Sequence, residues 1–324
     1  NATAVTTTGQ TVIKSTADMA NIKYNKELGT PNADSNIYID TDSVFFSAVP
    51  LLDHRKPNWK NEEQETIAGY VNEIAGEMQN YLNNFYDILG KKVFNIDKHR
   101  FEIKKEFVSK AGIWIAKKRY AQWIISDNGV PVDKLDVKGL DVVRSSYPAA
   151  FRKFMSEVLI EILRGDTEEQ LTNKIYDFKK NLPSMDVVKI AKAGAVKNLS
   201  KYMPKKKDQT AMFQFPSGCP AHVKASIAYN QLLKHFGVEN QYEPLKDGDK
   251  IKWVYLKQNP YGLDGVAMNG YNDPPQIMEL ISTYIDHDKI FERELLKKLE
   301  DFYGALNWGE VLSSTKTAEK FFSF

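Results

Sequence analysis

Two aspartates, Asp40 and Asp42, lie two residues apart in a polar centre that strand-forming residues flank on both sides over 36–48. The pattern predicts a β-hairpin with both carboxylates at its tip. Carboxylate oxygens are hard ligands, and Mg²⁺ commonly takes one or two of them together with substrate phosphates. A turn stabilised by its own aspartate is the alternative, because Asp and Ser are frequent turn residues. An EF-hand is excluded, since Phe45 and Leu51 stand where its glycine and its glutamate are required.

A basic cluster, Lys117-Lys118-Arg119-Tyr120, lies between apolar residues of a predicted sheet. We expect part of this cluster to project from one sheet face toward a polyanion, because Lys supplies point charges and Arg a fork for phosphate oxygens. A solvated basic edge that discourages strand pairing explains the cluster equally well when it is taken alone. When the cluster is taken together with the acidic hairpin upstream, whose carboxylates suit a metal ion, binding of nucleic acid is the better interpretation of the cluster.

The single cysteine, Cys219, excludes an internal disulfide and a zinc site built mainly on thiolates, and it suits a reducing compartment. Cys219 and His222 supply at most half of a metal site, and the other histidines show no ligand spacing, so we expect a structural role for both. The sequence has no glycine-rich phosphate loop, no Gly-x-Ser-x-Gly and no His-Glu-x-x-His. The sequence therefore has none of the motifs that usually identify a hydrolase or a dehydrogenase.

The chain has 324 residues, of which 42% are apolar, and this is enough for one large or two ordinary domains. The net charge is only +2, yet residues 26–87 are acidic while 91–119 and 152–207 are basic. No signal peptide and no apolar run of about 18 residues is present, so we expect a soluble, cytoplasmic protein without a membrane partner. The first residues lack an initiating Met and lead directly into a helical pattern, which suggests that the chain begins inside a larger unit.

The spacing of apolar residues predicts an α+β first half. Apolar residues recur every three or four positions from Ile67 to Leu89, which indicates a long amphipathic helix. Residues 100–108 and 112–126 alternate or run apolar, and we predict strands there. The pattern becomes helical after the turn residues 128–131 and again after Tyr147-Pro148, and we expect a domain boundary near 140–148 with a mostly helical second half. One helix carries Phe151 to Leu163 on its apolar face, further helices are predicted at 168–180, 220–236, 274–286 and 288–303, and a short strand is predicted at 250–256.

The motifs resemble those of family B DNA polymerases. Tyr38-Ile39-Asp40-Thr41-Asp42-Ser43 resembles motif C, Lys117-Lys118-Arg119-Tyr120-Ala121 resembles the basic palm motif, and the run from Lys138-Gly139 to Tyr147-Pro148 resembles the palm-to-thumb junction. The three motifs occur in the family's order. Similarity to the replicative polymerases of T-even-like phages in particular is carried by the runs Asn1–Gln10, Cys219–His222 and Asn259–Gly262 and by the aromatic C-terminus.

The resemblance implies a polymerase palm, an antiparallel sheet with helices, over residues 1–145, followed by a mostly helical thumb over 146–316. It implies that Asp42 is a catalytic metal ligand and that Asp40 is its acidic neighbour, in a two-metal transfer of nucleotides with Mg²⁺. DNA contacts are implied for Thr41, Lys117, Lys118, Arg119, Tyr120, Lys138 and Arg144. The tail, 317–324, carries Phe321, Phe322 and Phe324 and resembles the segment that docks on a sliding clamp; packing on the chain's own body is the alternative.

Several parts of the family's pattern do not occur in this sequence. Motif A, which supplies the second metal-binding aspartate, is missing, and so are the fingers helix that binds the nucleotide and the proofreading exonuclease. We therefore expect a split polymerase that is inactive without a second, N-terminal chain carrying these parts and sharing the two Mg²⁺ ions. Ile39 stands where the family usually has a small residue, which implies a local adjustment near the primer terminus.

Two further interpretations compete with a catalytic subunit. The chain could be a catalytically silent DNA-binding or processivity subunit that keeps the shape of palm and thumb. Retention of both Asp40 and Asp42 argues against this, because carboxylates repel DNA phosphate. A reverse transcriptase palm is a less favoured interpretation still, since the adjacent Asp-Asp pair of those enzymes does not occur here. The expected partners are primer-template DNA, a dNTP, the N-terminal chain and a sliding clamp, in the cytoplasm of an infected host cell.

Overall fold

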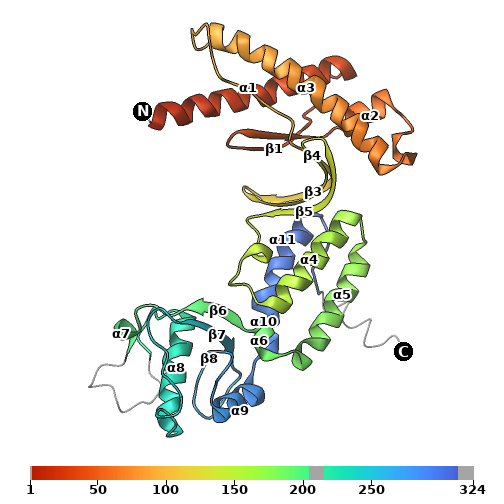
Figure 1. Ribbon diagram of the computed structural model, residues 1–324. Helices are drawn as coiled ribbons and strands as arrows, with labels where there is room; N and C mark the ends of the chain where they lie inside the picture. Colours follow the sequence, from red (N-terminus) through yellow and green to blue (C-terminus); the bar gives the residue numbers. More distant parts are fainter. Residues whose placement is uncertain (1, 204–214, 313–324) are drawn as a thin grey trace, which may run out of the picture. The chain divides into compact units, whose positions relative to one another are not determined.

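A computed structural model describes residues 2–203 and 215–312 of the chain. It divides into two compact units, Asn1–Lys138 and Gly139–Phe324 (Figure 1). The sequence places the end of the first domain at 145, whereas the division between the compact units falls between Lys138 and Gly139. Each unit has its own antiparallel sheets and helices, so the fold class is α+β, as predicted.

The first unit combines three helices with two small sheets. Its elements are α1 (Ala2–Leu28), β1 (Asn36–Asp40), β2 (Ser43–Phe46), α2 (Val49–Arg55), the 3₁₀ turn η1 (Trp59–Asn61), α3 (Gln64–Lys92), β3 (Phe107–Ala116), β4 (Arg119–Asp127) and β5 (Val130–Lys138). β1 and β2 form a two-stranded antiparallel hairpin, and β3, β4 and β5 form an antiparallel meander in that order. The predicted hairpin and the predicted long helix are both confirmed.

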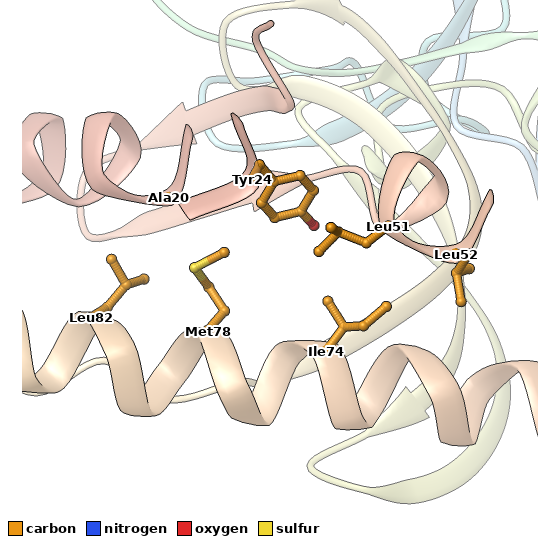
Figure 2. Close-up of a cluster of buried hydrophobic side chains, with 7 residues drawn as sticks. All are labelled: Ala20, Tyr24, Leu51, Leu52, Ile74, Met78 and Leu82. Atoms are coloured by element: carbon orange, nitrogen blue, oxygen red, sulfur yellow. The ribbon is translucent and has the colours of Figure 1, made fainter. Parts of the chain in front are cut away.

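A buried apolar cluster joins the three helices. Figure 2 shows Ile74, Met78 and Leu82 projecting from α3 toward residues of α1 and α2. Their spacing of four residues places them on one face of the helix, as the sequence pattern predicts. The other members of the cluster are Ala20, Tyr24, Leu51 and Leu52. The Tyr24 hydroxyl donates to the Ser47 carbonyl at 2.9 Å, so this buried phenol has a partner and also holds α1 against the end of β2.

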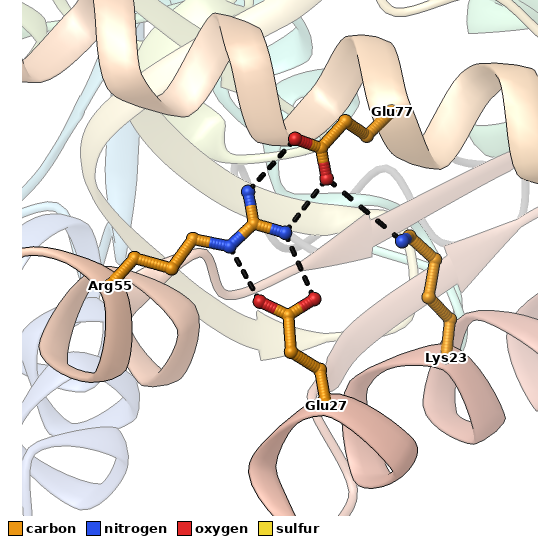
Figure 3. A network of polar contacts seen from close by, with 4 residues as sticks. All are labelled: Lys23, Glu27, Arg55 and Glu77. Atoms are coloured by element: carbon orange, nitrogen blue, oxygen red, sulfur yellow. Dashed lines mark hydrogen bonds and ion pairs between the residues drawn. The ribbon is translucent and has the colours of Figure 1, made fainter.

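An ion-pair network ties the same three helices together at their polar side (Figure 3). Arg55 of α2 donates to both carboxylate oxygens of Glu27 on α1 and to both of Glu77 on α3, at 2.5–3.0 Å. Lys23 lies 4.0 Å from Glu77. The Arg55 guanidinium lowers the pKa of both glutamates. An arginine that donates two parallel hydrogen bonds to a carboxylate fixes the relative orientation of the two groups and also stabilises their contact.

The strand predictions after α3 need three corrections. The predicted strand 100–108 is wrong for most of its length, because β3 begins only at Phe107. The predicted strand 112–126 is two strands, because the chain turns at Lys117 and Lys118 between β3 and β4. The helical pattern predicted after Pro131 is wrong there, because Val130–Lys138 form the strand β5, with apolar residues at Val130, Val132, Leu135 and Val137. The turn residues Asn128 and Gly129 before it, both at positive φ, are typical of a hairpin.

The second unit is mostly helical, with a three-stranded antiparallel sheet in the order β6-β7-β8. Its elements are η2 (Asp141–Val143), α4 (Ala149–Arg164), α5 (Glu168–Asn181), η3 (Leu182–Ser184), α6 (Val187–Ile190), β6 (Lys192–Ala195), α7 (Leu199–Tyr202), α8 (Ala221–His235), β7 (Lys250–Tyr255), β8 (Gly265–Met268), α9 (Pro275–Tyr284), α10 (His287–Phe291), the π-helical turn η5 (Glu292–Leu296) and α11 (Lys297–Ala305).

The predicted helices of this unit are confirmed, and so is the strand at β7. The predicted helix 288–303 is continuous but contains the π-helical turn η5. β6 and β8 were not predicted, because each has only four residues and two of those in β6 are alanine. None of the helices within the described ranges combines the length and apolar character that a bilayer crossing requires.

Candidate active site

Asp40 and Asp42 lie at the tip of the β1–β2 hairpin. Asp40 ends β1, and Ser43 begins β2. Thr41 between the aspartates has φ of 50°, and the Asp42 N–H donates to the Asp40 carbonyl at 2.6 Å. The Ser43 hydroxyl donates to the same carbonyl at 3.1 Å. This tight turn holds two carboxylates on one short stretch of backbone, as the sequence predicts. Its hydrogen bonds go to the Asp40 backbone carbonyl, so they are not those of an Asx turn, in which the side-chain oxygen accepts from the backbone.

A second hairpin tip lies against the first. Lys117 and Lys118 form the turn between β3 and β4, whereas the sequence analysis placed them within a strand. Lys118 has φ of 60°. Its N–H donates to the Tyr38 hydroxyl at 2.8 Å, and its ammonium lies 2.7 Å from Asp40 Oδ1 and 3.5 Å from Thr41 Oγ1. The basic tip (Lys117 and Lys118) is therefore bonded to the hairpin of the acidic tip (Asp40, Thr41 and Asp42) through both the backbone and the side chain of Lys118.

The contact changes the proton affinities of the two partners. The Lys118 ammonium lowers the pKa of Asp40, mainly through its hydrogen bond, and Asp40 raises the pKa of Lys118. Both shifts favour the charged forms at neutral pH. Because the Lys118 side chain is largely exposed, the ion pair adds little to the stability of the fold. Its effect is to fix the position of Lys118 relative to Asp40.

Four aromatic rings pack beneath the two tips. Tyr38 and Phe45 come from the acidic hairpin, and Trp114 and Tyr120 from the basic one, with ring centroids 5.7–6.0 Å apart. Tyr120 is buried in this cluster, and burial raises the pKa of its phenol. Aromatic pairs of this geometry add to the energy of burial, so the cluster fixes the position of one hairpin on the other.

Asp42 is the open member of the acidic pair. Its side chain is exposed, and no hydrogen bond or ion pair to its carboxylate is present among the described residues. It lies at a groove of about 1150 Å³ that β2, α3 and the β3–β5 sheet line. Within the described ranges, no three His, Cys, Asp or Glu side chains are grouped to hold a metal ion. Asp42 thus suits a Mg²⁺ ion that other ligands complete, since carboxylate plus phosphate is a usual ligand set.

The other predicted DNA-binding residues lie in two places. Lys117 is exposed at the basic tip, and Arg119 begins β4 opposite Ala116. Lys138 ends β5 and lies 3.0 Å from Asp136, which raises the pKa of the Lys138 ammonium. Arg144 belongs to the second unit, where it lies 2.8 Å from Asp141. The predicted clamp-binding residues Phe321, Phe322 and Phe324 lie outside the described residues.

The structure adds residues that the sequence analysis did not assign to the site. Tyr38 accepts the backbone hydrogen bond that orients Lys118, and Phe45 and Trp114 pack between the tips. The alternation along β1 places Tyr38 on the same face as Asp40, and this signal was available in the sequence.

Cys219 is buried, and burial lowers the pKa of His222.

Comparison with known proteins identifies the family of this chain. The chain matches the family model described as DNA polymerase family B over residues 1–304. It is 27% identical over 312 residues to a DNA-directed DNA polymerase of Enterobacteria phage T4, covering 92% of this chain and 33% of that protein. It is 26% identical over 319 residues to the corresponding enzyme of Escherichia phage RB69, covering 94% and 34%. The chain thus spans about a third of the length of these relatives. The family model covers both hairpin tips and most of the two compact units, and the chain belongs to the DNA polymerase family B.

Proposed function

We propose that this chain is the palm and thumb part of a replicative DNA-directed DNA polymerase. The observation that carries the proposal is the contact between the acidic tip and the basic tip, in which Lys118 bonds to Asp40 while Asp42 stays open. A site that combines an open carboxylate with adjacent lysines suits a metal ion and the phosphates of a nucleic acid at the same place. Membership of the family supports the same conclusion.

In this proposal Asp42 is a metal ligand and Asp40 shapes the site beside it. Asp42, together with ligands from the second chain, would hold two Mg²⁺ ions, which would make the primer 3′-hydroxyl more acidic and stabilise the charge on the leaving pyrophosphate. The 3′-hydroxyl would give its proton to solvent water, and its oxygen would form a bond to the α-phosphorus of the dNTP as the bond from that phosphorus to the pyrophosphate oxygen breaks. Asp42 contributes a negative charge next to the reacting phosphate, and Lys118 holds Asp40 in place through their hydrogen bond.

The DNA would lie along the basic residues of both units. We assign phosphate or groove contacts to Thr41, Lys117, Lys118, Arg119 and Tyr120 near the primer terminus, and to Lys138 and Arg144 at the junction between palm (1–145) and thumb (146–316). Lysine and arginine contacts to phosphate position the duplex without selecting its sequence, which suits an enzyme that copies any template.

The chain alone supplies only part of the metal site. Within the described residues Asp40 and Asp42 form no cluster with a third carboxylate, and two ions need more ligands than Asp42 provides. We propose that a second chain carries motif A, the nucleotide-binding fingers and the exonuclease, and that this chain is inactive without it. The tail 317–324, outside the described residues, would dock on a sliding clamp, and the complex would act in the cytoplasm of an infected host cell.

The decisive experiment is primer extension with Mg²⁺ by this chain alone and by this chain together with the polypeptide that co-purifies with it. We expect extension only by the complex, and loss of extension in Asp42→Ala with retained duplex binding. Extension by the lone chain would contradict the split. Duplex binding without extension by the complex would favour a silent DNA-binding subunit.

Deleting 317–324 tests the proposed clamp contact. Extension without a clamp should stay unchanged, while stimulation by the clamp should be lost. Stimulation that survives the deletion would refute the assignment of Phe321, Phe322 and Phe324.

A further inference from the structure

Arg144 presents its guanidinium to solvent beside a carboxylate that holds it. The terminal nitrogen Nη1 lies 2.8 Å from Asp141 Oδ1, while the Arg144 side chain remains 62% exposed. No ion pair of Arg144 with a residue other than Asp141 is present in the described ranges. The guanidinium has five N–H donors in a planar fork, so donors remain for a phosphate on its exposed side.

The backbone that carries this pair is fixed on both sides. Leu140 and Val142, on either side of Asp141, are only 3% and 6% exposed. The Arg144 N–H donates to the Asp141 carbonyl at 2.9 Å, and the Tyr147 N–H donates to the Arg144 carbonyl at 3.1 Å. Tyr147 is itself buried. The orientation of the guanidinium therefore depends on its side-chain contact with Asp141 and not on movement of the turn.

Lys298 of α11 is a second cation on the same carboxylate. Its ammonium lies 2.8 Å from Asp141 Oδ2 and 5.0 Å from the centroid of the Tyr147 ring, within the range of a cation–π contact. The Tyr147 hydroxyl donates to the Glu294 carbonyl in η5, the turn just before α11. The Lys298 side chain is 23% exposed. Lys298 is thus mostly enclosed, in contrast with Arg144.

The two cations divide the Asp141 carboxylate between them, one at each oxygen. A carboxylate beside DNA repels phosphate, and in a pair with Arg144 alone it would cancel the charge of the guanidinium. Lys298 adds a second positive charge, so that the three side chains together carry two positive charges and one negative charge. The arrangement keeps the charge of Arg144 effective while its orientation is fixed.

We infer that Asp141 and Lys298 are positioning residues for Arg144. Asp141 holds the guanidinium in one orientation toward a DNA phosphate, and Lys298 offsets the charge of the Asp141 carboxylate so that the phosphate is not repelled. That the ligand is DNA rests on the proposed function, in which Arg144 contacts the duplex. The positioning itself rests on the two contacts of Asp141 and on the contrast in exposure between the two cations.

The sign of one effect separates positioning from simple charge. Removing a negative charge near DNA should strengthen duplex binding if only charge matters. We expect Asp141→Ala to weaken binding of a primer-template duplex about fivefold, because Arg144 loses its fixed orientation, and Arg144→Met to weaken it about tenfold. Fluorescence anisotropy with the full chain and its co-purifying polypeptide measures both. Binding by Asp141→Ala that is equal to or tighter than that of the unmodified protein would overturn the inference.

Asp177→Ala is the matched control for the charge change. Asp177 is an exposed residue of α5, and no ion pair to it is present in the part of the chain that the structure describes. This variant should bind the duplex within about twofold of the unmodified protein or slightly more tightly. A fivefold loss in Asp177→Ala as well would overturn the inference, because the loss would not be specific to the contact with Arg144.

A double variant tests whether Asp141 acts through Arg144. Asp141→Ala combined with Arg144→Met should bind within about twofold of Arg144→Met alone, since the residue to be positioned is gone. A further fivefold loss in the double variant would overturn the inference and assign Asp141 to the stability of the turn. Asp141→Asn, which keeps the volume and removes the charge, provides the same comparison of signs if urea unfolding shows that Asp141→Ala is not folded.

Lys298→Met and Lys298→Arg test the offset of charge. Lys298→Met leaves the Asp141 carboxylate with less positive charge beside it and should weaken duplex binding about threefold, whereas Lys298→Arg keeps the charge and should bind like the unmodified protein. Equal binding by both variants would overturn the role of Lys298.

The outcomes distinguish this inference from the proposed function. If Arg144→Met binds the duplex normally, Arg144 is not a DNA contact, and both the proposed assignment and the inference are wrong. If Arg144→Met binds weakly while Asp141→Ala binds tightly, the assignment stands and the inference is wrong. If the variants bind in the expected order but the unmodified complex does not extend primers, the inference stands and the polymerase is wrong.

Discussion

The Lys118 ammonium lies 2.7 Å from Asp40 Oδ1, across 78 residues of sequence. Both residues stand at or beside hairpin turns with a residue at positive φ, Thr41 in one and Lys118 in the other. The aromatic cluster beneath them holds the two turns together. One consequence is that the aspartates of the first turn lie next to the lysines of the second, so changes in one turn should be felt at the other.

Asp42 should be essential for catalysis and dispensable for folding. Asp42→Ala in the complex is expected to lower the rate of primer extension by about a thousandfold, because a metal ligand is lost. The free energy of unfolding should change by less than about 0.5 kcal/mol, since the side chain is exposed. Asp97→Ala, at another exposed aspartate of the same unit, should leave both quantities unchanged. Normal extension by Asp42→Ala would remove it from the site.

The two lysines of the basic tip should differ in their effect on Asp40. Lys117→Ala and Lys118→Ala should each weaken DNA binding and reduce its salt dependence by about one counterion. Lys118→Ala should raise the pKa of Asp40 toward its ordinary value of 3.8 by more than Lys117→Ala does, because Lys118 makes the hydrogen bond whereas Lys117 acts only through its charge. NMR titration of the Asp40 carboxyl measures this shift. The same pKa in both variants would show that the contact is not formed in solution.

Gly112 is expected to tolerate no side chain. A Cβ at this position would lie 2.5 Å from ring atoms of Trp114, and Trp114 stacks on Tyr120 in the cluster beneath the tips. Gly112→Ala should therefore destabilise the chain by about 1–3 kcal/mol and weaken DNA binding with it. Gly9→Ala, in an open position of α1, should instead stabilise by about 0.5–1 kcal/mol. Urea unfolding of both variants provides the comparison.

The apolar cluster of Figure 2 should dominate the stability of the first unit. Met78 is 1% exposed and Ile88, on the same helix, is 52% exposed. Met78→Ala should cost about 2–5 kcal/mol through lost burial and the cavity left behind, whereas Ile88→Ala should cost less than about 0.5 kcal/mol. Similar costs in thermal or urea unfolding would mean that α3 buries a different face.

The Arg55 network should make stability depend on pH in the acid range. Glu27 and Glu77 have pKa values below the ordinary 4.5 because Arg55 binds both carboxylates. Their contribution is complete above pH 4.5 and is lost as the pH falls through the lowered pKa values. Arg55→Met should cost about 1–2 kcal/mol at pH 7, allowing for solvent screening, and should flatten the loss below about pH 4.5.

Lys60→Met is the matched control for the Arg55 network. Lys60 lies 3.6 Å from Asp53, and both side chains are mostly exposed. This change should have little effect on unfolding at any pH, because an exposed ion pair contributes little. An acid profile of Arg55→Met that matches the unmodified chain would show that other carboxylates control the pH dependence.

The sequence predicted the elements whose formation depends on neighbouring residues. The two strands of the acidic hairpin, the long helix α3 and the helices α4, α5, α8 and α9 follow from apolar spacing and turn residues, since each pattern buries one face. The hairpin tip with Asp40 and Asp42 was predicted for the same reason. Residues 117–120 were identified as a basic cluster, but their turn was missed because the apolar pattern runs through it without a Gly or Pro.

Only the tertiary structure decided which distant residues meet. The Lys118–Asp40 contact and the aromatic cluster join segments about 70 to 80 residues apart, and local propensity carries no information on such pairings. Residues 101–105 are a second case in which the local pattern was not sufficient. Their apolar alternation is that of a strand, but a strand forms only when a neighbouring strand supplies the second row of hydrogen bonds. By itself the sequence determined the acidic hairpin, the basic cluster and the helices. The contact between the two hairpin turns of the first unit, with a groove beside Asp42, was decided by non-local packing.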